Sequence, residues 1–279
     1  MKILVTGRGG RAGSWACRGL QLGGAIGATV KPMATRGDAQ QADIAIVVKR
    51  TPEEVMTALR GRRWVFDVVD FYPQPEASYW SKAQAVAWVK DRIRTLNPTA
   101  VIWPTQRMAE DCAVDKPSFC LPHHHRPGIE RNPIRETITC IGYEGAAPYI
   151  ETWMPAIRRE CERRNWQFLL NPGRLADLDV VLALRGGDHE GYVQRHWKSN
   201  VKLANAHGSG TPFIGQRECG YIETSSGAEY WIEDPDALGV CLSLLESRST
   251  RQNVQDTFLP CAFTLEKAAS QLLKFLHGL

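Results

Sequence analysis

The stretch Ile3-Leu4-Val5-Thr6-Gly7-Arg8-Gly9-Gly10 passes from a short apolar run directly into glycines. The second half of the chain repeats this pattern in Thr139-Cys140-Ile141-Gly142-Tyr143-Glu144-Gly145. A buried strand that runs into a glycine turn and then into a helix is typical of doubly wound α/β domains. The repeat therefore predicts two α/β halves of similar construction.

Both halves alternate apolar runs with stretches of helical composition. The predicted strands of the first half are 2–6, 43–48, 64–69 and 99–103, with helices at 11–22, 52–59 and 81–96. The second half has predicted strands at 137–141, 166–170, 178–184, 211–214 and 229–232, and helices at 150–161, 199–207, 234–246 and 265–276. This order of elements predicts two Rossmann-like, doubly wound parallel sheets.

A proline-rich segment separates the halves. Residues 121–133 hold three prolines and a glycine among polar side chains, and such a segment cannot continue a helix or a central strand. We expect domains at 1–130 and 131–279, with the apolar stripe of the last helix packing back on the first domain. We also expect the domains to face each other across a cleft, because ligands bind at the carboxyl ends of such sheets.

The composition is that of an ordinary globular protein. The 279 residues are 43% hydrophobic and 23% charged, and the formal net charge is +4. Residues 1–130 carry 18 Lys and Arg against 12 Asp and Glu, whereas residues 131–279 carry 16 against 18. The eight cysteines form no CxxC pair, and no apolar run is long enough for a signal peptide or a membrane span. We therefore expect a cytoplasmic protein without a membrane span.

The first glycine loop, residues 6–13, fits the pattern TGxxGxxG and resembles the phosphate loop of extended short-chain dehydrogenases. That family needs a catalytic Tyr with Lys four positions later, and no tyrosine of this chain has one. The next predicted strand also lacks an acidic residue for a ribose, although Lys31 and Arg36 could suit a 2′-phosphate. An NADP-dependent oxidoreductase or epimerase therefore stays open as an alternative.

The second half contains a basic segment, Trp197-Lys198-Ser199-Asn200-Val201-Lys202, that leads through a predicted helix into the strand at 211–214. Cations in the first turn of a helix and its free N–H groups attract a diphosphate. Arg185, directly after the strand at 178–184, is expected at the same edge of the sheet. Glu223 follows the strand at 211–214 by about nine residues.

This arrangement resembles the donor half of GT-B glycosyltransferases over residues 138–276, and the first half resembles them in architecture. The resemblance implies a glycosyltransferase that uses a nucleotide-diphosphate sugar, with a UDP-sugar favoured, and no bound cofactor. By the same resemblance Lys198, Lys202 and Arg185 hold the diphosphate, Glu223 holds the ribose, and Gly142 and Gly145 let the backbone approach the diphosphate. The Glu-x7-Glu spacing of the family is absent, since Glu218 and Glu223 are five apart.

The first half is expected to bind the acceptor. Asp70, where a predicted strand gives way to a loop, is the candidate general base if the reaction inverts the anomeric carbon. The excess positive charge of this half favours an acidic acceptor, with contacts expected from Arg8, Arg11, Lys49, Tyr72 and His124. Cys112, Cys120, His123 and His125 match no common metal site, so we predict no metal.

Hydroxymethylpyrimidine DNA, modified by a glycosyltransferase of the viral type, is one acidic acceptor. Its target base would flip out and stack on aromatic side chains such as Tyr72, and the protein would then work in the host cytoplasm. A non-catalytic nucleic-acid-binding module with the same fold is the remaining alternative. The sequence does not indicate an oligomeric state.

Overall fold

The computed structural model describes residues 1–10, 13–70 and 76–279. The chain divides into two compact units. Unit 1 consists of Met1–His123, His196–Ser199 and Leu265–Leu279, and unit 2 consists of His124–Arg195 and Asn200–Thr264. The short segment at 196–199 is therefore part of unit 1, although the chain on both sides of it belongs to unit 2.

Unit 1 is built on a parallel sheet with the strand order β2-β1-β3-β4-β5-β6. Its strands are β1 (Ile3–Gly7), β2 (Thr29–Val30), β3 (Ile44–Val48), β4 (Trp64–Asp67), β5 (Ala100–Trp103) and β6 (Ser118–Cys120). Every residue of β1, β3, β4 and β5 is buried, as expected for strands covered on both faces by helices.

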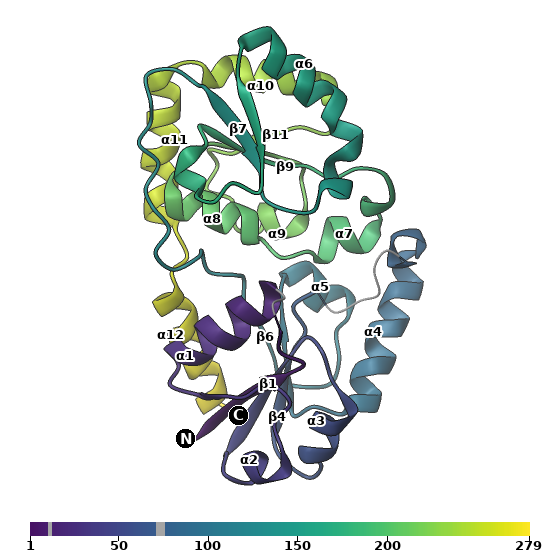
Figure 1. Ribbon diagram of the computed structural model, residues 1–279. Helices are drawn as coiled ribbons and strands as arrows, with labels where there is room; N and C mark the ends of the chain where they lie inside the picture. The colour runs from purple at the N-terminus through teal and green to yellow at the C-terminus, as the bar shows by residue number, and fades with distance from the viewer. Residues whose placement is uncertain (11–12, 71–75) are drawn as a thin grey trace. The chain divides into compact units, whose positions relative to one another are not determined.

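The helices of unit 1 lie on both sides of this sheet, with α1 and α12 on one side and α3 and α4 on the other (Figure 1). They are η1 (Trp15–Leu22, a π-helix), α1 (Gly23–Ala25), α2 (Arg36–Gln40), α3 (Glu53–Ala58), η2 (Glu76–Tyr79), α4 (Lys82–Leu96), α5 (Gln106–Asp111) and α12 (Leu265–His277). The longest of them, α4, begins at a capping box between Ser81 and Gln84 and ends at Asn97 in the left-handed conformation.

Unit 2 repeats this design with the parallel order β11-β10-β9-β7-β8. Its strands are β7 (Cys140–Tyr143), β8 (Gln167–Leu170), β9 (Val180–Ala183), β10 (Phe213–Gly215) and β11 (Tyr230–Trp231). Its helices are η3 (Ala147–Trp153), α6 (Met154–Arg164), η4 (Leu175–Asp177), η5 (Gly187–His189), α7 (Tyr192–Trp197), α8 (Val201–Ser209), α9 (Cys219–Ile222), η6 (Pro235–Ala237), α10 (Leu238–Leu245) and α11 (Arg248–Cys261).

The two sheets have the same doubly wound topology. In each, the first strand of the unit lies between the second and the third, so the winding direction reverses between β1 and β3 and between β7 and β9. Ligands of such sheets bind outside the carboxyl ends of the strands at this reversal. The predicted fold class, two Rossmann-like α/β domains with parallel sheets, is confirmed.

Several helices differ from their predicted bounds. Helix α8 begins at Val201, so Lys198 precedes it and does not share its first turn with Lys202. Helices α2, α5, α7, α9 and α11 and strands β2 and β6 were not predicted. Among the described residues, no helix is both long and apolar enough to span a membrane, and all eight cysteines are free thiols.

Candidate functional site

The glycine loop after β1 is held by close packing against the segment after β2. Gly9 has φ +72, and a Cβ at this position would overlap the Pro32 side chain. Only glycine adopts this conformation readily and leaves room for Pro32. The loop therefore keeps its backbone at the carboxyl edge of the unit 1 sheet, beside the end of β3.

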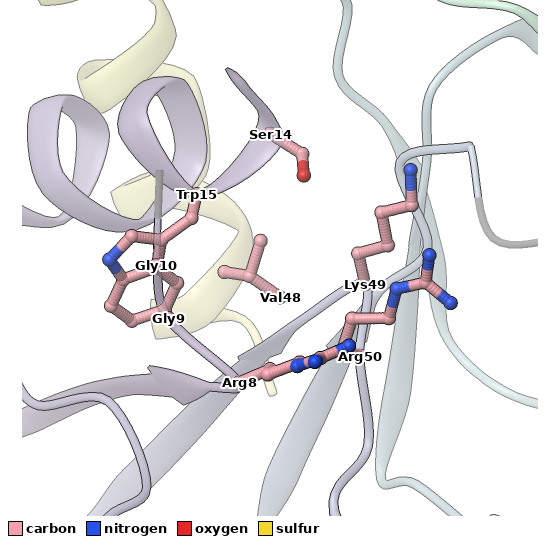
Figure 2. Close-up of a pocket in the computed structure, with 8 residues that line it drawn as sticks. All are labelled: Arg8, Gly9, Gly10, Ser14, Trp15, Val48, Lys49 and Arg50. Carbon is pink, nitrogen blue, oxygen red and sulfur yellow. The ribbon is translucent and has the colours of Figure 1, made fainter. Parts of the chain in front are cut away.

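A cavity of about 310 Å³ opens where the loops after β1 and β3 meet (Figure 2). In this view Trp15 and the Gly9–Gly10 segment lie on one side, Lys49 and Arg50 on the other, and Val48 between them. The lining residues are Arg8, Gly9, Gly10, Ser14, Trp15, Val48, Lys49 and Arg50. Arg8 and Lys49, both predicted to contact an acceptor, are thus brought together.

Asp70 lies just beyond the carboxyl end of β4 and is held between two lysines. It forms an ion pair with Lys49, and Lys198 Nζ lies 2.9 Å from its Oδ2. Burial alone would raise the pKa of Asp70, but the charges of Lys198 and Lys49 lower it well below its usual range. Lys198 belongs to the 196–199 segment of unit 1, so its observed partner is a carboxylate of that unit.

The backbone beside this ion-pair cluster is strained. Lys49 has φ +55 and Val69 has φ +53, a region that side chains with a Cβ avoid and that β-branched residues avoid most. Such conformations persist where the surrounding structure enforces them, and they are frequent at ligand sites. Here they lie at the ends of neighbouring strands, β3 and β4.

The other predicted acceptor contacts are placed differently. Arg11 and Tyr72 lie outside the described residues. His124 belongs to unit 2 and is only 1% exposed, with its Nδ1 2.8 Å from the carbonyl oxygen of His125. His124, predicted to contact the acceptor, is therefore buried, and that contact stays a prediction.

The carboxyl edge of the unit 2 sheet contains a buried ion pair. Arg185, two residues after β9, donates from Nε to Glu218 Oε1 over 2.6 Å, and both side chains are buried. The backbone N–H of Arg185 donates to Gln216 Oε1 over 2.6 Å, and its guanidinium lies over the ring of Tyr149. Glu218 Oε2 is buried without a hydrogen-bond partner among the described residues.

Lys202 lies in the first turn of α8 with its side chain buried. It is 8% exposed, and its Nζ lies 3.8 Å from the centre of the Tyr143 ring, at the end of β7. Burial raises the pKa of Tyr143, so the ring faces the ammonium group as a neutral phenol. Lys202 is therefore a buried lysine whose ammonium group faces an aromatic ring of unit 2.

Of the other predicted donor contacts, Gly145 lies in the loop after β7, where its N–H donates to Asn171 Oδ1 over 2.7 Å. Gly142 lies inside β7, where a Cβ would lie 2.6 Å from Leu178 Cδ2 and 2.7 Å from the carbonyl oxygen of Leu169. Gly142 thus lies within the strand and not in the loop after it, and its contact with a diphosphate stays a prediction. Glu223 is exposed at the end of α9.

Sequence reasoning overlooked Glu218 as the partner of Arg185. Its position gave a usable signal, since it follows β10 by three residues, just as Arg185 follows β9 by two. Because parallel strands end at the same edge, residues at such offsets come together. The small cavity at this place is lined by Arg185, His189, Glu190, Arg195, Gln216, Arg217 and Glu218.

Within residues 1–10, 13–70 and 76–279, no group of three or more His, Cys, Asp and Glu side chains could hold a metal ion. Cys17 Sγ lies 2.9 Å from His123 Nδ1 in unit 1. Burial raises the pKa of this thiol to about 11, so it stays protonated at neutral pH. The pair therefore has the character of a buried hydrogen bond and not of an activated nucleophile.

No protein-family model matches the chain, and no curated protein sequence does either. Solved structures match over its whole length. Anabaena Alr3699/HepE in complex with UDP-glucose shares 11% identity, with 100% of both chains covered and a TM-score of 0.64. AviGT4, a glycosyltransferase involved in avilamycin A biosynthesis, shares 11% identity over 99% of this chain and 97% of its own, with a TM-score of 0.59.

A third match is UDP-GlcNAc 2-epimerase from Neisseria meningitidis bound to UDP-GlcNAc, with 10% identity, 100% of both chains covered and a TM-score of 0.56. At such identities the likeness shows the fold alone. The fold is that of the GT-B glycosyltransferases, as expected from the second half of the sequence.

Proposed function

We propose that this protein is a glycosyltransferase that binds a UDP-sugar at the carboxyl edge of unit 2. The observation that carries the proposal is the group formed by Arg185, Glu218 and Lys202 around the point where the sheet reverses between β7 and β9. A buried ion pair adds little net stability, because the desolvation of its charges offsets their attraction. Charged groups gathered in this way at a sheet reversal are candidates for a ligand site.

The diphosphate is assigned to Lys202 and the amino end of α8. Asn200 makes no side-chain capping hydrogen bond at this helix end, whose partial positive charge attracts an anion. Arg185 adds a second cation at the same edge of the sheet. The complexes with UDP-glucose and UDP-GlcNAc named above are examples of proteins of this fold that bind UDP-sugars.

Two carboxylates are candidates for the ribose hydroxyls. Glu223 is the residue expected from the family resemblance, and it is exposed. Glu218 is buried beside Arg185, and its Oε2 still has the capacity to accept a hydrogen bond. UDP titrations of Glu218→Gln and Glu223→Gln decide between them: the variant that weakens UDP about tenfold or more identifies the ribose ligand.

The proposal is tested by calorimetric titration with UDP. We expect the native protein to bind UDP and Lys202→Met to bind it at least about tenfold more weakly, since a charge-assisted contact is lost. Lys274→Met, on an exposed face of α12 in unit 1, is the matched control and should bind like the native protein. Equal UDP affinity in all three proteins would remove the support for this donor site.

The acceptor is proposed to be acidic and to bind at the cations of unit 1. Asp70 as the general base stays a prediction. Its two lysine partners stabilise the carboxylate, and a carboxylate of low pKa is a weak base unless a substrate displaces them. We expect Asp70→Asn to reduce kcat far more than UDP binding if the prediction is right, and to raise the KM of the acceptor with kcat unchanged if Asp70 only orders Lys49 and Lys198.

Hydroxymethylpyrimidine DNA is retained as one candidate acceptor. Arg8, Lys49 and Arg50 supply positive charge, while Tyr72 lies outside the described residues. Incubation of the protein with hydroxymethylated duplex and radiolabelled UDP-sugars is the direct assay. Label that stays with small molecules excludes this acceptor, and the same outcome with UDP binding intact leaves the donor assignment unaffected.

The oxidoreductase alternative has less support. Lys31, its candidate for a 2′-phosphate, forms an ion pair with Asp38, with Nζ 2.6 Å from Oδ1. Saturable quenching or enhancement of NADPH fluorescence on mixing would favour that alternative. The predicted cytoplasmic location remains a prediction.

A further inference from the structure

The basic cavity of unit 1 lies at the place where a doubly wound sheet binds its ligand. Its lining comes from the loops after β1 and β3, the two strands between which the winding direction reverses. The proposed UDP-sugar site of unit 2, with Arg185 and Lys202, lies at the same topological position in its own sheet. The cavity is a second candidate ligand site, formed within one unit and independent of the first.

The charges around this cavity leave a positive excess. Arg8 and Arg50 form no ion pair or side-chain hydrogen bond with any described residue. Lys49 is paired with Asp70, but that carboxylate already has Lys198 as a second partner. One negative charge is thus shared by two lysines, and two guanidinium groups stand beside them without a counter-charge. Such a set attracts a group with more than one negative charge.

The positive charge at this edge is also compact. Arg62 and Arg63 lie just before β4, at the opposite edge of the parallel sheet, and Arg62 donates to the carbonyl oxygen of Ala42. Arg92, on α4, donates to Thr51 Oγ1. Proteins that hold a DNA duplex through its backbone contact on the order of six to ten phosphates with a row of cations. The described cations at this edge form no such row.

The size of the cavity fits the same conclusion. A volume of about 310 Å³ is at the low end of small-molecule sites, which range from about 300 to 1,000 Å³. Gly10, with φ +92, lines the cavity, and a Cβ at this position would meet no atom within 4 Å. Backbone N–H groups of a glycine loop combined with guanidinium groups are a common setting for phosphate.

We propose that the unit 1 cavity binds a phosphomonoester dianion through Arg8 and Arg50, with Lys49 held in place by Asp70. The ligand is a small phosphorylated molecule. The phosphate site itself does not depend on the proposed function. The further assignment, that the bound molecule is the sugar acceptor or the phosphorylated part of the acceptor, does rest on the proposed function. Free inorganic phosphate would use the same contacts.

The test is a calorimetric titration with inorganic phosphate and with glucose 6-phosphate, in the presence of saturating UDP so that the unit 2 site is filled. Arg50→Ala and Arg8→Gln should each weaken phosphate binding about tenfold or more, because each removes a charge-assisted contact. Arg63→Ala removes an exposed arginine from the opposite edge and is the matched control. It should bind phosphate like the native protein.

Three results would overturn the proposal. The first is the absence of saturable binding at millimolar phosphate, and the second is a change of less than twofold in both Arg50→Ala and Arg8→Gln. The third is tighter binding of a hydroxymethylated duplex than of glucose 6-phosphate, with the duplex affinity lowered equally by Arg50→Ala and Arg63→Ala. That result would show a nucleic-acid surface instead.

Tighter binding of glucose 6-phosphate than of inorganic phosphate supports a phosphorylated acceptor. UDP titration of the same variants separates the two sites: loss of phosphate binding alone concerns unit 1, and loss of UDP binding alone concerns the donor proposal.

Discussion

Glu229 is a buried carboxylate of unit 2 that accepts hydrogen bonds from several directions. His207 Nε2 lies 2.8 Å from its Oε1, and donors from Ser225, Ser226 and Gly227 surround both oxygens. Burial alone would raise its pKa, but the hydrogen bonds from His207 and Ser225 lower it to about 2. The ionised carboxylate therefore ties the end of α8 to the loop before β11.

The lowered pKa makes the stability of the protein depend on acid. A carboxyl whose pKa is lower in the folded state stabilises that state above its unfolded pKa of about 4.5, and this contribution is lost as the pH falls from there toward 2. We expect Glu229→Gln to reduce the free energy of unfolding by about 2 to 3 kcal/mol at pH 7 and by clearly less at pH 3. Urea unfolding at both pH values measures the difference. An equal loss at both would show that the charge of Glu229 contributes nothing.

At the level of single residues, the sequence predicted which charged side chains lie at the edge of the sheet, but it did not predict their burial or their partners. Arg185 and Lys202 were expected at the carboxyl edge of the second sheet, and both lie there. That Lys202 is buried could not be read from the sequence, because its place depends on Tyr143, 59 positions earlier, whose ring covers the ammonium group. The ion pair of Glu218 likewise depends on Arg185, which lies in another loop, 33 positions earlier.

At the level of elements, strand β7 depends on a glycine at its centre. A Cβ at position 142 would lie 2.6 Å from Leu178 Cδ2 and 2.7 Å from the carbonyl oxygen of Leu169 on the neighbouring strand β8. The backbone of β8 cannot move without disturbing its pairing with β7. The strand therefore has no room for a methyl group.

We expect Gly142→Ala to lower the free energy of unfolding by about 1 to 3 kcal/mol, the usual cost of overpacking a core. Gly173→Ala is the control, since a Cβ there would meet no atom within 4 Å and its φ is not positive. Chemical denaturation followed by circular dichroism compares the two variants. A Gly142→Ala protein as stable as Gly173→Ala would mean that β7 and β8 can separate to make room.

The buried strands were predicted to within a few residues because buried parallel strands are continuous apolar runs. The short edge strands β2 and β6 were missed, since their residues are largely exposed or half-buried and form no such run. Helix α7 was missed, and α8 begins two residues after its predicted start at 199, in a stretch, 192–207, that contains no proline or glycine to mark a helix end. The break between the two helices has a tertiary cause. Trp197 Nε1 donates to Asp111 Oδ2 over 3.0 Å and Lys198 to Asp70, so the segment at 196–199 follows unit 1 and leaves the helical path. Contacts between residues so far apart in the sequence cannot be predicted from the local sequence around them.

At the level of the whole molecule, one sheet topology occurs twice with different charges at the same position. The reversal in unit 1 carries Arg8, Lys49 and Arg50, whereas the reversal in unit 2 carries Arg185 with Glu218 beside it. The net charge of +4 hides this contrast. An all-cationic site suits a bare phosphate group, and a mixed site suits a nucleotide, which presents both phosphates and hydroxyls.

This contrast predicts that the two ligands protect different parts of the chain from hydrogen exchange. A ligand that binds only the folded state at 100 times its dissociation constant stabilises that state by about 2.7 kcal/mol, which slows exchange through the opening it opposes by about a hundredfold. UDP should therefore protect peptides that contain residues 140–145, 185 and 201–218. Inorganic phosphate, added with UDP already bound, should protect peptides around residues 3–10 and 44–50. Exchange followed by mass spectrometry measures both, with peptides of α4 as an internal reference at low protection. Protection of unit 1 by UDP and of unit 2 by phosphate would reverse both assignments. Equal protection of all peptides would mean that the two units open together, and it would contradict the prediction of separate protection.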